Sequence, residues 1–472
     1  MLSHSTSSDS LGSNNAQASQ APNEESSPSL FGLPLYLWVL IAVALAFPVG
    51  LFLGQQASVA DSWPSWARSV LSALVTLLEL LPTLILRALT ALAGPLVVLA
   101  ILSAIITNEI HGRQGVRMMV YYLINTLVAM TIGLVLTYVI QPGRETKTAS
   151  DTSAQVSAAT KSPKLIDVLG GSSPAAKKLP EAKSVKDLIT EIVPRNLFDA
   201  LLQNNLAQLV LFTLAAAIAL SRIRDDQQLR GDTAYLSVVN VVTVGFELLM
   251  RILLWVVALV PLAVFGVVAT SLAREGLELF RNLGLFILTV LIGLSIQFFW
   301  YLGQLGLFAR MSPRRFLQGA ADVMATTFST ASTAATMPVT LRCLQTKLGV
   351  SRQSSQLAAC VGTNFNNDGT ALYQAVAALY FAQTQGMALD LSQQLVIVAS
   401  TLLASVGAGG IPSGSFVTMP LILSAVNLSP EKLPILLTVD WFLDRCRTTS
   451  NVVGDMTVAI LLDRSRAGET EK

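Results

Sequence analysis

Long apolar segments dominate the first two thirds of the chain. Six of them have at least about 20 residues, the length that an α-helix needs to cross the hydrocarbon core of a membrane. They are 33–54, 82–107, 116–140, 201–220, 236–268 and 283–308. The pattern therefore predicts a series of membrane-spanning helices.

Composition supports the same conclusion. Only 13% of the residues are charged, whereas soluble proteins carry about 25%. Three cysteines are too few for an extracellular disulfide scaffold, and a net charge of +2 is too small to indicate a nucleic-acid partner. We therefore expect an integral membrane protein in contact with a lipid bilayer.

Basic residues predict the orientation of the spans. Residues 1–30 contain no Lys or Arg, so the first span is interpreted as a retained helix rather than a signal peptide, behind a disordered cytoplasmic tail. Arginines follow the even-numbered spans, and positive loops face the cytoplasm. They are Arg113 and Arg117, then Arg222, Arg224 and Arg230, then Arg310, Arg314 and Arg315. This predicts a multi-pass protein of the cell membrane (plasma or inner), with N- and C-termini in the cytoplasm and 141–195 as an outer loop.

The last third of the chain contains three interruptions rich in small, hydroxyl or amide residues, at 326–340, 362–370 and 405–415. Irregular backbone at membrane depth is tolerated where it is buried in protein or lines a cavity, and paired interruptions mark binding sites in secondary transporters. The alternative is three ordinary water-exposed loops between short helices.

The segment 433–462 places several charges in an otherwise apolar span. At about 100° per residue, six polar residues share an arc of about 100° on a helix, while Arg445 points to one side. These six are Asp440, Asp444, Arg447, Thr448, Asn451 and Asp455. Charges inside a membrane are costly and usually functional. The alternative is a set of ion pairs, Asp440–Arg447 and Asp444–Arg447, that only neutralise one another; it leaves Asn451 and Asp455 unexplained.

The chemistry of this stripe favours an acidic amino acid as the ligand. Arg447 offers a planar fork for a carboxylate, and Asp444 can accept from an ammonium group. Asp455, Asn451, Asn366 and Asp368 supply hard oxygen ligands, which suit a cation such as sodium. The lack of His-rich or Cys-rich clusters argues against a transition metal.

Four motifs stand out in the last third of the chain: STASTAATMPVT (329–340), NNDGTALYQA (366–375), GAGGIP (407–412) and VDWFLDRCRTTSNVVGD (439–455). Together they resemble the glutamate transporter family, the dicarboxylate/amino acid:cation symporters, and the last motif is similar to the animal excitatory members. The resemblance implies an all-α integral membrane fold with eight transmembrane helices and two re-entrant helical hairpins, at about 312–347 and 391–426. It also implies a homotrimer and an elevator mechanism. Residues 31–270 would be mainly scaffold, with 116–140 assigned to the transport domain, which continues over 280–464.

The resemblance also implies the residues of the sites. Substrate would be bound by Ser332, Thr333, Thr370, Ile411, Ser415, Asp444, Arg447, Thr448 and Asn451. One cation site would use Gly362, Asn366, Asn451 and Asp455, and a second Asn364 with backbone at Ser405, Val406 and Ala408. A third would use Tyr122, Asn125, Thr126, Asn366 and Asp368. The only cofactor-like components would be the transported sodium ions.

The chain departs from the family pattern at a few positions. Asn367 replaces a methionine, and Asn125 stands where a threonine is usual. Archaeal members have an arginine at the position of Ala331, and Arg445 could supply that guanidinium, as in animal members. Gln374 stands where animal glutamate transporters have a titratable glutamate.

Two other functions were weighed. A membrane hydrolase using Asp368 with Asp444 or Ser332 lacks a general base, because the only histidines are His4 and His111. The sequence therefore predicts a transporter rather than an enzyme. A proton-coupled C4-dicarboxylate carrier or a neutral amino acid carrier on the same scaffold stays open: Arg447 disfavours neutral substrates, and Asp444 disfavours plain dicarboxylates less strongly.

Overall fold

The computed structural model describes residues 29–30, 33–57, 64–107, 112–144, 200, 206–408, 414–430 and 433–470. These residues are helical apart from short connections and a two-residue antiparallel pairing of β1 (Ser29–Leu30) with β2 (Leu33–Pro34). The helical class expected from the apolar runs is confirmed. Residues 1–28 of the expected tail and residues 145–195 of the expected outer loop lie outside the described residues.

The first half of the chain forms α1 (Leu35–Ala57), α2 (Ser65–Thr107), α3 (Gly112–Ile140), α8 (Leu206–Arg230), α9 (Tyr235–Ala258), α10 (Val260–Glu275) and α11 (Glu278–Phe308). The second half forms α12 (Pro313–Thr330), α13 (Thr333–Thr346), α14 (Arg352–Phe365), α15 (Asp368–Thr384), α16 (Leu391–Ala408), α17 (Gly414–Ala425), the 3₁₀ turn η2 (Leu433–Leu436) and α18 (Leu437–Thr470).

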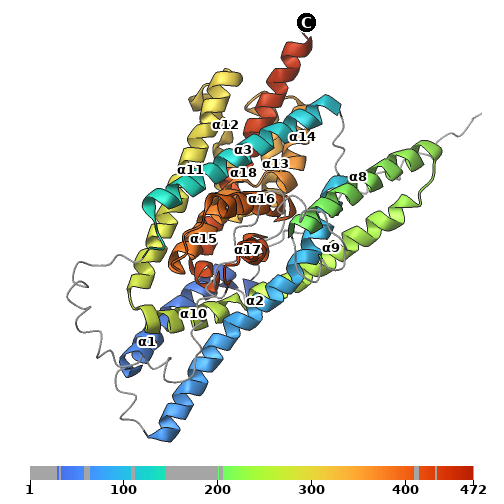
Figure 1. The fold of residues 1–472 in the computed structure, drawn as a ribbon. Coiled ribbons are helices and arrows are strands. Elements are labelled where there is room, and N and C mark those ends of the chain that lie inside the picture. The colour runs from blue at the N-terminus through green and yellow to red at the C-terminus, as the bar shows by residue number, and fades with distance from the viewer. Residues whose placement is uncertain are drawn as a thin grey trace, which may run out of the picture.

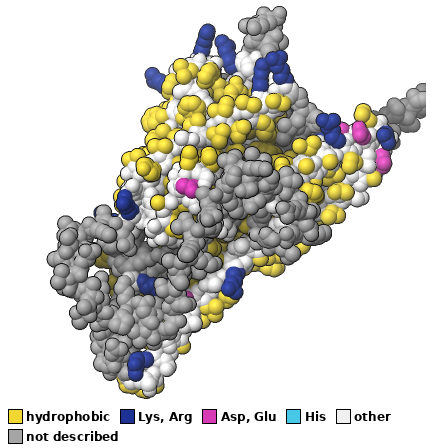
Figure 2. Space-filling model, viewed as in Figure 1, with side chains coloured by type: hydrophobic (Ala, Val, Ile, Leu, Met, Phe, Trp, Pro, Cys, Tyr) yellow, Lys and Arg dark blue, Asp and Glu magenta, His cyan; other side chains and the backbone are white. Residues whose placement is uncertain are grey.

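Among the described helices, five are long and apolar enough to cross a membrane: α1, α2, α3, α9 and α11. Their outer faces carry large exposed apolar side chains, such as Leu45, Val139, Trp255 and Phe299. Figure 2 shows hydrophobic side chains spread over the upper half of the visible face, with several Lys and Arg side chains at its upper edge. Contiguous exposed apolar surface of this kind needs lipid around it.

Two predicted spans have different boundaries in the structure. α2 begins at Ser65 rather than at residue 82 and continues through Pro82 and Pro95. The predicted span 236–268 is two helices, α9 and α10, which meet at Leu259 with Pro261 in the first turn of α10. Proline fits the first turn of a helix, where its missing N–H needs no intrahelical acceptor, so Pro261 is compatible with a new helix that begins at Val260.

The helices form two packed groups (Figure 1). In one, α1 packs on α10, and α2 on α8, α9 and α10; in the other, α3, α14 and α15 pack with α11 and α18. The pair α16–α17 lies between the groups and contacts α2, whereas α12 and α13 pack on α18 and on each other. This arrangement brings most of the predicted site residues into the second group, while Ser405 and Ser415 lie on the pair α16–α17 between the groups.

The two expected hairpins coincide with helix pairs α12–α13 and α16–α17. α12 ends where Ala331 adopts a left-handed conformation (φ 52°), and the Ser332 hydroxyl caps α13 by accepting from the Ala335 amide at 3.2 Å. The interruption at 326–340 is therefore only two residues wide. The connection between α16 and α17 lies outside the described residues. The total of eight spans and the re-entrant depth of the hairpins stay predictions.

Candidate functional site

An interrupted helix faces α18 and forms the centre of the site. α14 ends at Phe365 and α15 begins at Asp368, so Asn366 and Asn367 leave the helix, as the sequence predicted for 362–370. The backbone amide of Gly369, in the first turn of α15, donates to Asn451 Oδ1 at 2.8 Å. A buried helix start needs such a partner, because its first N–H groups have no intrahelical acceptor.

Glycines permit the close approach of this interruption to α18. A Cβ atom at Gly369 would lie 2.7 Å from the carbonyl oxygen of Arg447, and one at Gly454 would lie 2.7 Å from Asn366 Nδ2. A Cβ at Gly362 would lie 2.0 Å from Asp455 Oδ1. Each position therefore requires glycine for the polar groups to meet.

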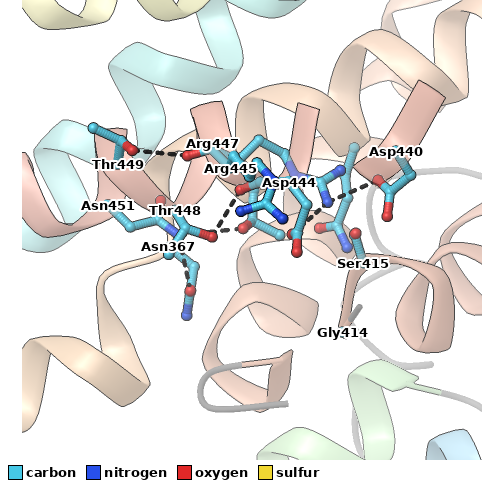
Figure 3. Close-up of polar contacts among 12 residues, drawn as sticks. Asn367, Gly414, Ser415, Asp440, Asp444, Arg445, Arg447, Thr448, Thr449 and Asn451 are labelled. Atoms are coloured by element: carbon cyan, nitrogen blue, oxygen red, sulfur yellow. Dashed lines mark hydrogen bonds and ion pairs between the residues drawn. The ribbon is translucent and has the colours of Figure 1, made fainter. Parts of the chain in front are cut away.

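Arg447 is the largest fully buried side chain of the described residues, with 1% exposure. Its Nη2 lies 2.7 Å from Asp444 Oδ1 and 2.8 Å from Asp440 Oδ1, so both ion pairs weighed from the sequence are present. Nε and Nη1 have no hydrogen-bond partner among the described residues. Figure 3 shows the guanidinium between the two carboxylates, with Ser415 nearby. The arginine thus keeps donors for a further acceptor beyond the pairs that neutralise it.

The other predicted substrate residues differ in how they are engaged. The Ser415 hydroxyl is buried without a partner among the described residues, and Thr370 Oγ1 accepts from Asn451 Nδ2 at 3.3 Å. Thr448 instead donates to the Asp444 carbonyl within its own helix. Ser332 and Thr333 lie at the α12–α13 connection, and Ile411 lies outside the described residues.

Three buried oxygen-bearing side chains meet where the first and third cation sites were predicted. Asn366 Nδ2 donates to Asp455 Oδ1 at 2.9 Å and to the Asn451 carbonyl at 3.0 Å, while Asn366 Oδ1 has no partner in the described part of the chain. Asp368 accepts from the Thr126 hydroxyl at 2.6 Å and from the Tyr301 hydroxyl at 2.8 Å. Among the described residues, neither Asp368 nor Asp455 has a basic hydrogen-bonding partner, and each accepts from neutral polar donors.

Asn125 and Tyr122 have other hydrogen-bond partners. Asn125 Oδ1 accepts from Trp300 Nε1 at 3.0 Å and from Gln304 Nε2 at 2.7 Å, both on α11. The Tyr122 hydroxyl donates to the Ala358 carbonyl at 2.8 Å. The structure therefore brings Thr126 to Asp368, and engages the carboxamide oxygen of Asn125 with α11 instead.

The second predicted cation site involves the end of α16. Ser405, Val406 and Ala408 are in the last turn of that helix rather than in irregular backbone. The last four carbonyls of an α-helix have no intrahelical partner, so they can accept from groups outside the helix. The Ser405 carbonyl accepts from Asn367 Nδ2 at 2.8 Å.

Residues 35–465 match the model of the sodium:dicarboxylate symporter family. The chain belongs to this family.

Individual relatives are similar to this symporter at moderate identity. Excitatory amino acid transporter 2 of Homo sapiens is 31% identical over 433 residues, covering 79% of this chain and 70% of the relative. Excitatory amino acid transporter 3 of Mus musculus is 28% identical over 474 residues, covering 92% and 87%. Neutral amino acid transporter B(0) of Mus musculus is 30% identical over 482 residues, covering 92% and 82%. The prediction of a multi-pass membrane transporter rather than an enzyme is confirmed at the level of the class.

Arg445 connects the symporter's last helix to the α12–α13 connection. Its Nη1 donates to the carbonyls of Phe328 and Ser329, at 2.9 and 2.5 Å, near the C-terminal end of α12. A cation is favourable there because a helix C-terminus carries partial negative charge. The position to one side of the stripe, expected from the helical wheel, gives Arg445 this separate partner.

The sequence did not predict that Tyr301 contacts Asp368 or that Asn367 donates to the end of α16. Tyr301 lies on α11 and is fully buried, yet its hydroxyl reaches Asp368. A tyrosine in an apolar run resembles an ordinary core residue. The available signal was the spacing of Gln297, Tyr301 and Gln304, which puts three polar groups on one face of an otherwise apolar helix.

Proposed function

We propose that this protein is a secondary active symporter that takes up acidic amino acids, aspartate or glutamate, coupled to sodium. The observation that carries the proposal is the guanidinium of Arg447, fully buried and with Nε and Nη1 unpartnered among the described residues. An unpaired buried donor is costly, so a ligand carboxylate would stabilise it.

The charge around Arg447 favours a ligand that also carries an ammonium group. Asp440 and Asp444 both pair with the same nitrogen of Arg447, so two carboxylates surround one guanidinium. The Asp444 side chain is 28% exposed and is the more accessible of the two. In an acidic amino acid, the ammonium group would pair with Asp444, and the side-chain carboxylate would accept from the unpaired donors of Arg447.

Sodium is proposed as the coupling ion because buried carboxylate and amide oxygens lie beside the proposed substrate residues. Asp368 and Asp455 are fully or almost fully buried, and the buried Asn366 Oδ1 has no partner among the described residues. Carboxylate and amide oxygens are ligands for small hard cations. Asn451 links the two regions, since it contacts Asn367, Gly369 and Thr370.

The two helix groups support an elevator mechanism as part of the proposal. The proposed sites lie on the second group and on the pair α16–α17, and this pair meets the first group through α2. Such a boundary could slide as the second group carries substrate across the membrane. A homotrimer with cytoplasmic N- and C-termini belongs to the same proposal.

A neutral amino acid or C4-dicarboxylate carrier is the second candidate. Arg447 is already flanked by two carboxylates, which could satisfy its charge without a ligand carboxylate. The similarity to neutral amino acid transporter B(0) favours the neutral variant of this alternative.

The test is counterflow of labelled substrate in proteoliposomes containing the purified full-length protein. We expect aspartate and glutamate to exchange and to require the presence of sodium, with proton and potassium tested separately as comparisons. Counterflow of serine or succinate but not aspartate would overturn the acidic amino acid assignment. Exchange of aspartate without sodium would overturn the coupling ion while leaving the substrate.

A further inference from the structure

Asn367 has an unusual position for an asparagine at a helix start. It is the N-cap residue of α15, where an Asn side chain ordinarily accepts from the first turn of its own helix. Here no such bond is made, and the residue is 6% exposed. Its carboxamide is therefore committed to other partners.

The carboxamide nitrogen points at the ends of two other segments. Nδ2 donates to the Ser405 carbonyl at 2.8 Å and lies 3.5 Å from the Asn364 carbonyl. Ser405 is in the last turn of α16, and Asn364 is in the last turn of α14. Two helix C-termini, each carrying partial negative charge and free carbonyls, thus converge on one NH₂ group.

A small cation would be stabilised at this same point. Free carbonyls at helix ends coordinate sodium in transporters, and here the NH₂ group of Asn367 lies within hydrogen-bonding distance of both carbonyl oxygens. The NH₂ group of Asn367 directs the positive end of its dipole at these carbonyls. A cation cannot occupy the same place between the two helix ends as this NH₂ group.

We propose that the Asn367 carboxamide takes the place of one sodium ion and holds α16 to the α14–α15 interruption. This inference rests on the proposed function, because it concerns how many sodium ions accompany the substrate. The second cation site expected from the resemblance is replaced by an amide hydrogen bond in this chain, and aspartate binding is coupled to one sodium ion fewer than in a protein lacking that donor.

The other end of the carboxamide reaches the proposed substrate site. Asn367 Oδ1 accepts from Asn451 Nδ2 at 3.2 Å, a contact visible in Figure 3. Asn451 Oδ1 in turn accepts from the Gly369 amide. Binding of substrate at Asn451 is thereby connected to the position of α16 through a single side chain.

The experiment measures aspartate affinity of the purified full-length protein over a series of sodium concentrations. The slope of log Kd against log sodium concentration gives the number of sodium ions taken up with substrate. In Asn367→Met and Asn367→Leu, the donor is gone and the point between the two helix ends is open. The slope should steepen by about one, so that each tenfold dilution of sodium weakens binding by about tenfold more than in the wild type.

The matched control is Gln383→Met on the same helix. The Gln383 carboxamide also bridges segments, donating to the Thr137 carbonyl and accepting from the Gly143 amide, but it lies at the far end of α15. Its removal should leave the sodium slope unchanged. The leucine variant, close in shape to asparagine, keeps the test available if the methionine variant does not fold.

An unchanged slope in either Asn367 variant that still binds aspartate would overturn the inference. Absence of aspartate binding by the wild type at every sodium concentration would instead overturn the proposed function. The two failures are therefore distinguishable.

Discussion

The carboxylate of Asp440 lies 2.8 Å from the guanidinium of Arg447, two helical turns further along α18, and the two side chains are 6% and 1% exposed. Buried charges are stable only when they are paired, and removing one partner of a buried pair is strongly destabilising. Asp444 pairs with the same nitrogen, so one guanidinium faces two carboxylates. The two carboxylates leave the site with an excess of negative charge, while the arginine retains free donors.

Arg447→Ala should abolish uptake of aspartate and glutamate and admit serine or alanine. Loss of one partner of a buried charge pair costs about 2–5 kcal/mol, which is more than tenfold in Kd. Radiolabelled uptake into proteoliposomes measures the change. Arg251→Ala, an exposed position on α9, is the control. Unchanged aspartate affinity in the Arg447 variant would refute its role in selectivity.

Asp455→Asn should shift the sodium dependence of aspartate binding to about tenfold higher concentration, about 1.4 kcal/mol, because a neutral carboxamide attracts a cation less strongly than a carboxylate does. Asp455 Oδ1 accepts from Asn366 and has no basic partner in the described structure. The control is Asp463→Asn, the same substitution on the same helix. Asp463 accepts from the Ser351 amide, so this variant should leave the sodium dependence unchanged. If the wild type binds aspartate equally well without sodium, proton coupling becomes the better interpretation.

Gly362→Ala should disrupt the sodium site by displacing Asp455. A Cβ there would lie 2.0 Å from Asp455 Oδ1 and 2.7 Å from the Tyr122 hydroxyl, and overpacking of this kind costs about 1–3 kcal/mol. We expect sodium to lose its stabilising effect in a thermal melt. At Gly284 a Cβ would meet nothing within 4 Å, so Gly284→Ala should keep the sodium effect. Equal sodium responses of the two variants would contradict the close approach.

Tyr301→Phe should weaken sodium affinity by about tenfold, since a hydrogen bond to a charged group contributes about 1.5–3 kcal/mol. The phenol donates to Asp368 Oδ2, and its loss leaves that carboxylate held by Thr126 alone among the described donors. Tyr138→Phe, a 70% exposed position on α3, should have no effect. A fall in maximal uptake rate with unchanged sodium affinity would argue for a purely structural role.

Transport should not require a proton carried at Gln374. Its Nε2 donates to Thr418 Oγ1 at 2.6 Å, which ties α15 to α17, and a carboxamide has no ionisable proton at any pH. The measurement is substrate-driven alkalinisation outside proteoliposomes with sodium present. A proton that moves stoichiometrically with aspartate, and still does so in Gln374→Ala, would show that another group carries it.

The sequence alone determined the membrane character, most of the spans and the chemistry of the last helix. Apolar runs and charges within them are local properties, readable from composition and helical spacing. The shared face of Asp440, Asp444 and Arg447 followed from the 3.6-residue period, and the structure has both ion pairs. The interruption at 362–370 was likewise visible as a polar run within apolar flanks.

Only the tertiary structure decided which side chains meet across the interruption. Asp368 reaches Thr126 and Tyr301, Asn125 is engaged with α11, and Asn367 donates to Ser405. These partners come from helices far apart in the chain, and helical periodicity fixes the face of one helix without fixing its depth or rotation against another. The allowed approach is set by close packing, as the missing Cβ at Gly362 illustrates. An amide such as Asn367 offers both donors and an acceptor, so its role depends on which of them the surrounding backbone engages.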